Sequence, residues 1–346
     1  MMHTGNKWAW AIFLSLGAMA ATAGTPSQYK IANRFHLPGD DRWDFLEADP
    51  AAGRVFISHG TQTQVMDEKT GKLVGTIPDT KGVHGIAIAE TLGKGYISNG
   101  KDTSVTVFDL KTLATLGKVR VTGINPDAIL YDPFSRHIFT FNGKSGNATV
   151  IDPATDKVVA TIDLGGKPEV GAADGKGNIY LNLEDKSAVA IIDAKTNKVS
   201  KTWPMAPGES PSGLAMDPAT RRLFSVCENK LLVVMDAATG KVVATVPIGE
   251  GVDGVAFDPA SKRIFASNGE GSLTVVQQKD MDHYAVLETL PTQKGAKTIT
   301  LDPKTHHIFL STAEFGPAPA PSADNPKARP PVKQNTFTVL DIAPST

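Results

Sequence analysis

Two stretches of this sequence are nearly identical and differ at an ionisable position. GVHGIAIA covers residues 82–89 and GVDGVAFD covers residues 251–258, so His84 in the first stands where Asp253 stands in the second. Seven stretches share this register, and at the swapped position they carry Asp44, His84, Asp127, Glu169, Ser212, Asp253 and Lys297. A purely structural position would repeat one residue type in every copy. The variation therefore predicts a specialised site.

The chemistry of these side chains points to a bound cation or a polar ligand. Carboxylates brought together without a cation repel one another and raise each other's pKa. A divalent metal ion, or a cationic or polyhydroxylated molecule, would relieve this repulsion. Carboxylates and amides suit Ca²⁺ or Mg²⁺, whereas histidine and cysteine suit Zn²⁺ or Cu²⁺. The metal ligands we expect are His59, His84, Asp127, Glu169, Cys227 and Asp253.

A second recurrent position carries mostly polar residues and ends an aromatic-led segment in each copy. It holds His59, Asn99, Asn142, Leu183, Cys227, Asn268 and Thr312, with Asn182 and Glu184 on either side of Leu183. The small-ligand contacts we expect are Arg42, Trp43, Asp44, Asn99, Asn142, Asn182, Glu184, Asn268 and Lys297. Cys227 has no second cysteine for a disulfide and no adjacent base, so it also fits a small buried apolar residue.

The elements that would position these residues are short strands in a repeated unit of just over forty residues. Each copy has a short apolar segment, an aromatic-led strand such as RVFISH or KRIFASN, an alternating strand ending in Asp, and a last strand such as KVVATIDL. Four short strands with turn residues between them are typical of a propeller blade. Seven copies predict an all-β, seven-bladed propeller.

The ends of the chain predict how the ring closes. The seventh copy stops after FTVLDI, residues 337–342, without a fourth strand, whereas YKIANRFHLP, residues 29–38, precedes the first copy. The N-terminal strand should therefore complete the last blade and remove the exposed sheet edges. In such a blade, the loop before the first strand and the loop after the second lie on one face. Both variable positions should then meet at one mouth of the central channel.

The segments YISN, FTFN, FASN and FISH resemble the signature of YVTN-repeat propellers, the YncE-like bacterial family, from Tyr29 to Ile342. This resemblance implies an exported seven-bladed propeller and does not fix the function. Single-stranded DNA binding belongs to one branch of that family. The net charge of −1, from 35 basic and 36 acidic residues, gives no support for nucleic acid as a partner here.

The first 23 residues read as a secretory signal peptide. Lys7 precedes the apolar run WAWAIFLSLGAMA, and Ala21-Thr22-Ala23 offers a cleavage site. We therefore expect a periplasmic or secreted protein, with residues 24–346 forming one propeller domain. No second apolar run suggests a transmembrane segment in the mature chain. We expect a monomer.

A Pro-rich insertion at about residues 316–333 interrupts the seventh copy and should form a semi-rigid strap at the mouth. It could cover the channel as a lid or form a surface loop away from it. Arg42 and Trp43 should lie at the same rim, where Trp43 could stack on a ligand or pack on the first blade.

Three functions remain open at this point. The first is a binding protein for a metal ion or small ligand, and the second is a metal-dependent lactonase-like hydrolase with His84 as general base and Asn142, Asn182, Glu169 and Asp253 around the ion. The third is a protein-interaction platform. A wet channel with scattered charges, in which His84 is only hydrogen-bonded, is the simplest alternative to all three. No nucleotide, flavin or haem motif is present.

Overall fold

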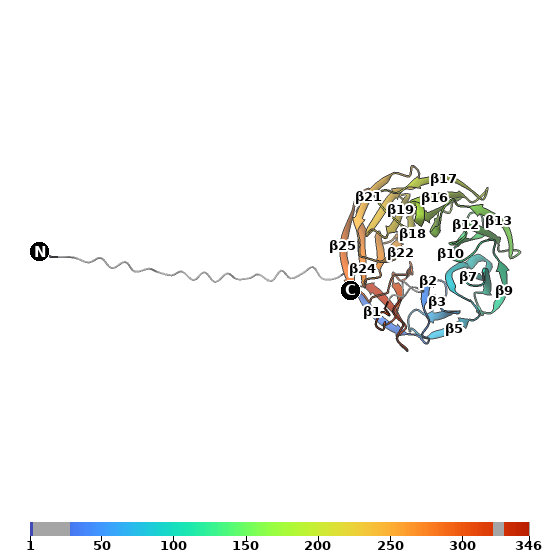
Figure 1. Ribbon diagram of the computed structural model, residues 1–346, viewed down its shortest axis with the longest axis horizontal. Coiled ribbons are helices and arrows are strands. Elements are labelled where there is room, and N and C mark those ends of the chain that lie inside the picture. The colour runs from blue at the N-terminus through green and yellow to red at the C-terminus, as the bar shows by residue number, and fades with distance from the viewer. Residues whose placement is uncertain (3–27, 321–328, 346) are drawn as a thin grey trace.

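The computed structural model describes residues 1–2, 28–320 and 329–345. Their strands form seven antiparallel sheets of four strands each, arranged in chain order around a ring (Figure 1). The predicted seven-bladed, all-β propeller is thus confirmed. The described residues contain no α-helix and only two single-turn 3₁₀ helices, Glu90–Leu92 and Glu184–Lys186. No helix in this part of the chain is long and apolar enough to cross a bilayer.

The blades use the chain consecutively from their innermost strand outward. Blades 1 to 3 are β2 (Trp43–Asp49), β3 (Arg54–His59), β4 (Gln62–Asp67) and β5 (Leu73–Ile77); β6 (Val83–Ala89), β7 (Lys94–Asn99), β8 (Ser104–Asp109) and β9 (Thr115–Arg120); and β10 (Pro126–Asp132), β11 (His137–Asn142), β12 (Asn147–Asp152) and β13 (Lys157–Asp163).

Blades 4 to 6 follow the same plan. They are β14 (Pro168–Ala173), β15 (Asn178–Leu183), β16 (Ala188–Asp193) and β17 (Lys198–Pro204); β18 (Pro211–Asp217), β19 (Arg222–Cys227), β20 (Leu231–Asp236) and β21 (Val242–Pro247); and β22 (Val252–Asp258), β23 (Arg263–Asn268), β24 (Ser272–Gln278) and β25 (Tyr284–Pro291).

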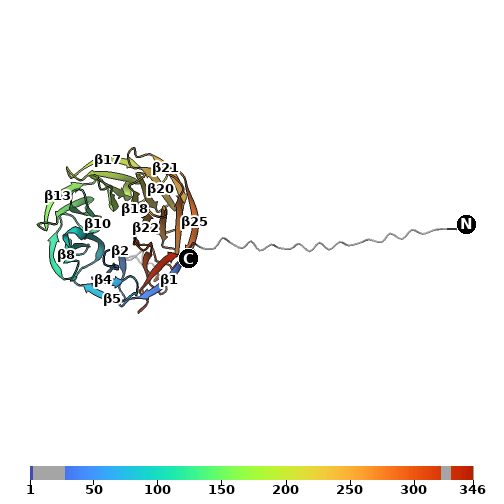
Figure 2. The same cartoon turned by 180° about the vertical axis from the view of Figure 1, so that it is seen from behind.

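Blade 7 is built from both ends of the chain, as the sequence predicts. Its strands from inside to outside are β26 (Ile299–Leu301), β27 (Ile308–Thr312), β28 (Thr338–Pro344) and β1 (Tyr29–His36). β1 pairs antiparallel with β28 from Tyr29–Pro344 to His36–Thr338. Figure 2 shows β1 beside the C-terminus from the other side of the ring. This pairing closes the ring and covers an edge that would otherwise be exposed.

The core consists of apolar layers between neighbouring blades. The two middle strands of each blade are the most buried, because the neighbouring blades cover both of their faces. Phe139 and Phe141 of blade 3, for example, are buried in one cluster with Ile179 and Leu181 of blade 4. Burial of this kind is the main stabilising contribution to the fold. It also makes the blades a rigid frame for the residues at the ring's centre.

Aspartates recur at two turns of the repeat, the Asp-Pro turn after the innermost strand and the hairpin after the third strand, and both positions are structural. In the Asp-Pro turns, Asp132 accepts a hydrogen bond from the Ser135 backbone nitrogen at 2.9 Å, and Asp258 accepts one from Ala260 at 3.0 Å. In the outer hairpins, Asp236 does the same for Thr239 at 2.9 Å. These carboxylates hold turns and are not free for chemistry.

Two of the sequence predictions fall largely outside the described residues. These are the signal peptide, of which residues 3–23 lie outside, and the middle of the Pro-rich insertion, residues 321–328. The described flanks of the insertion pair with each other: Phe315 bridges Val332, and the Gly316 backbone nitrogen donates to the Pro331 carbonyl at 2.9 Å.

Candidate functional site

The innermost strands surround a cavity of about 1360 Å³ at the centre of the ring. The variable position supplies most of its charged wall. The residues of that position that line the cavity are Asp44, His84, Asp127, Glu169, Asp253 and Lys297. Ser212 is not among the lining residues, and its hydroxyl lies 3.4 Å from the Val252 carbonyl oxygen. One recurrent sequence position therefore faces one shared space, in six of seven blades.

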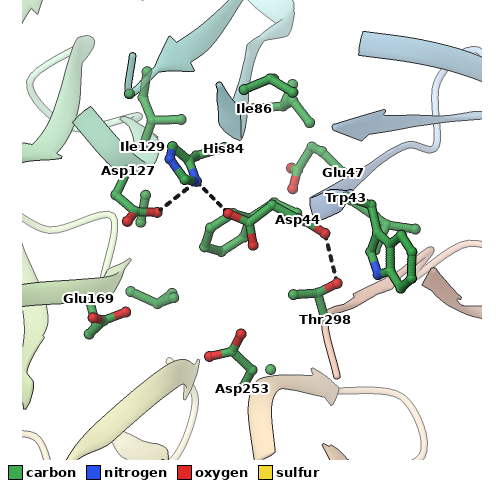
Figure 3. A pocket seen from close by; sticks show the side chains of 18 of the residues that line it. Trp43, Asp44, Glu47, His84, Ile86, Asp127, Ile129, Glu169, Asp253 and Thr298 are labelled. Carbon is green, nitrogen blue, oxygen red and sulfur yellow. Dashed lines mark hydrogen bonds and ion pairs between the residues drawn. The ribbon is translucent and has the colours of Figure 1, made fainter. Parts of the chain in front are cut away.

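Three of these side chains form a compact cluster on one side of the cavity (Figure 3). His84 Nδ1 lies 2.5 Å from Asp44 Oδ2 and 3.6 Å from Asp127 Oδ1. One potential ligand atom from each of the three residues lies within 4.8 Å of the other two. The side chains remain 23–28% exposed, and this exposure is to the cavity. The cluster is thus closely spaced and open to a ligand.

Hydrogen bonds from neighbouring blades fix the backbone of the cluster. The Ser58 hydroxyl of blade 1 donates to the His84 carbonyl, and the Ser98 hydroxyl of blade 2 donates to the Asp127 carbonyl. Thr298 of blade 7 donates to the Asp44 carbonyl at 2.7 Å. The sequence interpretation missed these positioning residues. The signal for Ser58 and Ser98 was the serine in FISH and YISN, just before the recurrent polar position.

Gly85 allows the inner strands of blades 2 and 3 to approach closely beside the cluster. A Cβ atom at this residue would lie 3.0 Å from both the Asp127 carbonyl oxygen and the Ile129 backbone nitrogen. Any side chain here would therefore push β6 away from β10. The glycine after His84 in GVHGIAIA thus allows His84 Nδ1 and Asp127 Oδ1 to lie 3.6 Å apart.

The electrostatics of the cluster favour a positive charge on His84. Burial by itself lowers the pKa of His84, but the hydrogen bond to Asp44 and the charges of Asp127, Asp44 and Glu169 outweigh it, so the pKa lies above its ordinary value of 6.5. Burial raises the pKa of Asp127 to about 6, with the Asp44 and Asp253 charges adding to the rise and His84 opposing it. A divalent ion would replace the proton shared by this cluster.

The opposite side of the cavity is different, because each carboxylate there has a lysine. Lys167 Nζ lies 2.9 Å from Glu169 Oε1 and also pairs with Glu184, and Lys297 pairs with Asp253. Burial raises the pKa of Glu169 to about 8, against the opposing effect of Lys167. These acids are already neutralised by the chain itself. The structure does not gather them with His84 into one ligand set.

The asparagines of the second recurrent position lie inside the blades and do not line the cavity. Each donates to hydroxyls of the next strand. Asn99 reaches Thr106 at 2.8 Å, and Asn268 reaches Thr274 at 3.0 Å. Asn142 donates to Asn147 Oδ1 at 2.8 Å and to Thr149 at 3.1 Å. Among the described residues, these amides hold strands together, and they are not brought to the expected ligand site.

Asn182 and Glu184 behave differently from each other. Asn182 is buried and donates to the Ser212 and Gly213 carbonyls, both at 3.1 Å, so it joins blade 4 to blade 5. Glu184 is partly exposed and belongs to the Lys167 ion pairs. The four residues of the lactonase-like set are therefore not gathered around one point. Asn142 and Asn182 lie inside blades, and Glu169 and Asp253 are each paired with a lysine.

His59 and Cys227 are also away from the cavity wall. His59 is buried, stacks on Phe337 with ring centroids 4.1 Å apart, and its Nε2 lies 3.0 Å from the Asp41 carbonyl oxygen. Cys227 is buried with its Sγ 3.7 Å from Met205 Sδ. Burial raises the pKa of its thiol to about 12, so the reactive thiolate is suppressed. Neither side chain is placed to bind an ion held by His84.

Arg42 and Trp43 do line the cavity. Arg42 donates through Nη2 to the Pro330 carbonyl at 2.7 Å, and Arg329 of the same segment also lines the cavity. Trp43 packs against Phe315 and Phe337, with centroids 5.9 and 5.4 Å away. The described end of the Pro-rich insertion thus reaches the mouth. Trp43, in β2 of blade 1, is therefore packed against two aromatic side chains of blade 7.

Glu47 is a cavity residue that the sequence interpretation did not single out. It lies three residues after Asp44, where the other blades carry Ala87, Leu130, Ala172, Ala215, Ala256 and Thr300. Burial, with a smaller effect of Asp49, raises the pKa of Glu47 to about 8. Its signal in the sequence was a single ionisable residue in an otherwise small or apolar position.

The arrangement offers one imidazole nitrogen and two carboxylates to a small cation. This donor set suits Zn²⁺ and related divalent ions, and three protein ligands leave coordination positions open. With both carboxylates ionised and His84 neutral, a divalent ion would be charge-balanced by its ligands. On the opposite side of the cavity, the lysines already balance the charges of Glu169 and Asp253, so a cation is less favoured there.

Comparisons with known proteins agree on the fold. No family model matches the chain. One curated relative, Antigen Lp49 of Leptospira interrogans serogroup Icterohaemorrhagiae serovar copenhageni, is 25% identical over 218 residues. The match covers 47% of this chain and 47% of that protein, so the chain spans about half the length of the curated relative it matches.

Solved structures with the same architecture are distant in sequence. A chain of Kuenenia stuttgartiensis hydrazine synthase has a TM-score of 0.67 at 18% identity and covers 84% of this chain and 96% of its own. A chain of the mitotic checkpoint complex has a TM-score of 0.73 at 14% identity, covering 97% and 98%. U3-55K has a TM-score of 0.74 at 9% identity, covering 89% and 97%. These likenesses establish the propeller fold alone.

Proposed function

We propose that this protein is an exported propeller that binds a divalent metal ion at the mouth of its central channel, through Asp44, His84 and Asp127. A propeller provides a platform for binding or interaction, and the single observation that supports this function is the compact cluster of three ligand atoms in an open cavity. The expected ion is Zn²⁺, because an imidazole is one of three donors.

The proposal includes export and family. The N-terminal Lys7, apolar run and small-residue cleavage site support secretion to the periplasm or beyond, and the FISH, YISN and FASN segments support membership of the YVTN-repeat, YncE-like propellers. Cell fractionation with N-terminal sequencing tests the first point. A mature chain beginning near Gly24 in the periplasm or medium is expected, and a cytoplasmic chain retaining Met1 would contradict it.

Metal analysis tests the function directly. Purified wild-type protein should carry or take up one divalent ion, measured by elemental analysis and by titration calorimetry with Zn²⁺, Ca²⁺ and Cu²⁺. Loss of the imidazole ligand in His84→Ala should weaken Zn²⁺ binding by on the order of a hundredfold, at the upper end of what outer-shell changes alone cost.

The matched control lies across the same cavity. Asp253→Asn changes an acid at the equivalent position of blade 6, but that acid is already paired with Lys297. It should alter Zn²⁺ affinity by less than about threefold, because it removes no ligand. Wild-type protein that takes up none of the three ions would overturn the proposed function, and so would equal losses in both variants.

A further inference from the structure

The rim of the cavity carries positive charges that have no acidic partner among the residues that the structure describes. Six acidic and six basic residues line the cavity, and the basic ones are Arg42, Lys101, Lys144, Lys167, Lys297 and Arg329. Lys167 and Lys297 form the ion pairs described above. Within residues 28–320 and 329–345, no carboxylate lies within ion-pair distance of the other four cations. We call these four residues the rim cations: Arg42, Lys101, Lys144 and Arg329.

The rim cations come from adjacent parts of the ring. Lys101 and Lys144 occupy the same position, two residues after the second strand, in blades 2 and 3, whose innermost strands carry His84 and Asp127. Arg42 precedes β2 in blade 1, and Arg329 belongs to blade 7. Arg42, Lys101 and Lys144 therefore come from blades 1 to 3, as the Asp44–His84–Asp127 cluster does, and Arg329 joins them from blade 7 beside the Arg42–Pro330 hydrogen bond.

Two of the rim cations are held close together. The hydrogen bond from Arg42 to the Pro330 carbonyl places its guanidinium beside Arg329. Partial burial and the charge of Arg329 both lower the pKa of Arg42. The part of the chain that the structure describes places no carboxylate between these two guanidinium groups. Their mutual repulsion favours an anion there, and Arg is the side chain best suited to carboxylate and phosphate oxygens.

The charge balance of the cluster makes the rim cations significant. A divalent ion neutralises Asp44 and Asp127, and the lysines neutralise Glu169 and Asp253. Of the six lining acids only Asp41 and Glu47 then remain against four rim cations, so positive charge is in excess around the ion. Three protein ligands also leave coordination positions open toward the cavity. The cavity volume of about 1360 Å³ far exceeds the space that an ion and its waters need.

We propose that the metal ion is bound together with a small organic anion, whose oxygens complete the coordination of the ion and whose remaining anionic groups contact Arg42, Lys101, Lys144 and Arg329. This inference rests on the proposed function, because it needs an ion at Asp44, His84 and Asp127. The ligand class is a polycarboxylate or a phosphate ester, since both offer the same oxygen chemistry to arginine and to the metal.

Citrate gives the sharpest test, because in solution it competes for Zn²⁺. If the protein binds only the bare ion, citrate removes zinc from it. If the protein binds the metal with the anion, zinc and citrate stay on it together. Zinc-loaded wild-type protein is desalted in buffer with citrate, with glycerol 3-phosphate or with neither, and metal and anion are measured in the protein fraction. The anion that co-elutes identifies the class.

Two double variants distinguish the effect of the rim cations from the effect of the protein's net charge. Lys101→Glu with Lys144→Glu reverses two rim cations, and Lys111→Glu with Lys195→Glu makes the same change in net charge at exposed turn residues outside the cavity. We expect the turn variant to retain as much zinc, and as much citrate, as the wild-type protein does. The rim variant should keep zinc in plain buffer and lose at least about tenfold more of it in citrate, because close charge reversals cost several kcal/mol.

The outcomes distinguish the two proposals. Wild-type protein that holds zinc in plain buffer but loses it to both anions would overturn the ternary complex and leave the metal site intact. The same conclusion follows if the rim and turn variants behave alike. Citrate or phosphate-ester binding that is unaffected by zinc would also overturn the ternary complex. No zinc in plain buffer would overturn the proposed function itself.

Discussion

Blades 1 to 3 and blades 4 to 7 line opposite sides of one cavity and use the same strand position in opposite ways. On the first side, Asp44 and Asp127 share only His84, which lies 2.5 and 3.6 Å away. On the second side, Glu169 and Asp253 each have a lysine. The difference shows that an acidic residue at a channel position is not by itself a ligand, because a neighbouring lysine removes its attraction for a cation.

We call the side of the cavity with Asp44, His84 and Asp127 the open side, and the side with Glu169 and Asp253 the paired side. The largest effect on metal affinity should come from introducing, on the open side, a lysine like that of the paired side. Blade 4 reads Lys167-Pro168-Glu169 and blade 3 reads Asn125-Pro126-Asp127, so Asn125→Lys places an ammonium group two residues before Asp127. That group should pair with Asp127 and repel a divalent ion. Zn²⁺ affinity measured by calorimetry should fall by on the order of a hundredfold or more.

The reciprocal change is the control for this exchange. Asn125 has a left-handed backbone, with φ of 60°, so lysine there costs some stability, and thermal unfolding of the variant must be recorded beside its affinity. Lys167→Asn frees Glu169 and should raise Zn²⁺ affinity by no more than about threefold, through weaker repulsion alone. A stable Asn125→Lys variant that binds Zn²⁺ like the wild type would refute the cluster as the metal site.

The same comparison explains which sequence predictions could succeed. The repeated unit predicted the ring, its seven blades and the closing strand, because strand alternation and turn chemistry are local and recur seven times. The variable position of the repeat also predicted the cavity wall in six of seven blades, since one register places one residue at the same point of each blade. What the register could not show was which acids would have a lysine within reach.

The second recurrent position shows where the reasoning was incomplete. Asn99, Asn142 and Asn268 repeat one residue type, which is the mark of a structural position, and each is followed by hydroxyl or amide residues on the next strand that accept its hydrogen bonds. The side-chain NH₂ groups of these asparagines donate inside the blade, so the amides turn away from the cavity. His59 similarly packs on Phe337, a contact between residues far apart in sequence that no local pattern indicates.

A smaller effect, on stability, is expected at Glu47, which lines the cavity three residues after Asp44 on the same strand. On the paired side, the equivalent residues Ala172, Ala215 and Ala256 carry no charge. The folded protein keeps the Glu47 proton up to about pH 8, whereas the ordinary pKa of a glutamate is 4.5. The folded state therefore binds more protons than the unfolded chain between these values, and stability should fall as the pH rises through this window.

Glu47→Gln removes the ionisation and should remove this loss of stability. Because water in the cavity screens the group, we expect the variant to gain on the order of 2 kcal/mol in the free energy of unfolding at about pH 9 and almost nothing at about pH 4. Denaturant unfolding at several pH values measures this, with the exposed Glu90→Gln as the matched control. If Glu47→Gln and Glu90→Gln change stability equally at high pH, Glu47 is solvated like a surface acid. The cavity would then be no less polar on its open side than bulk water, and the contrast between its two sides would rest on the lysine pairs alone.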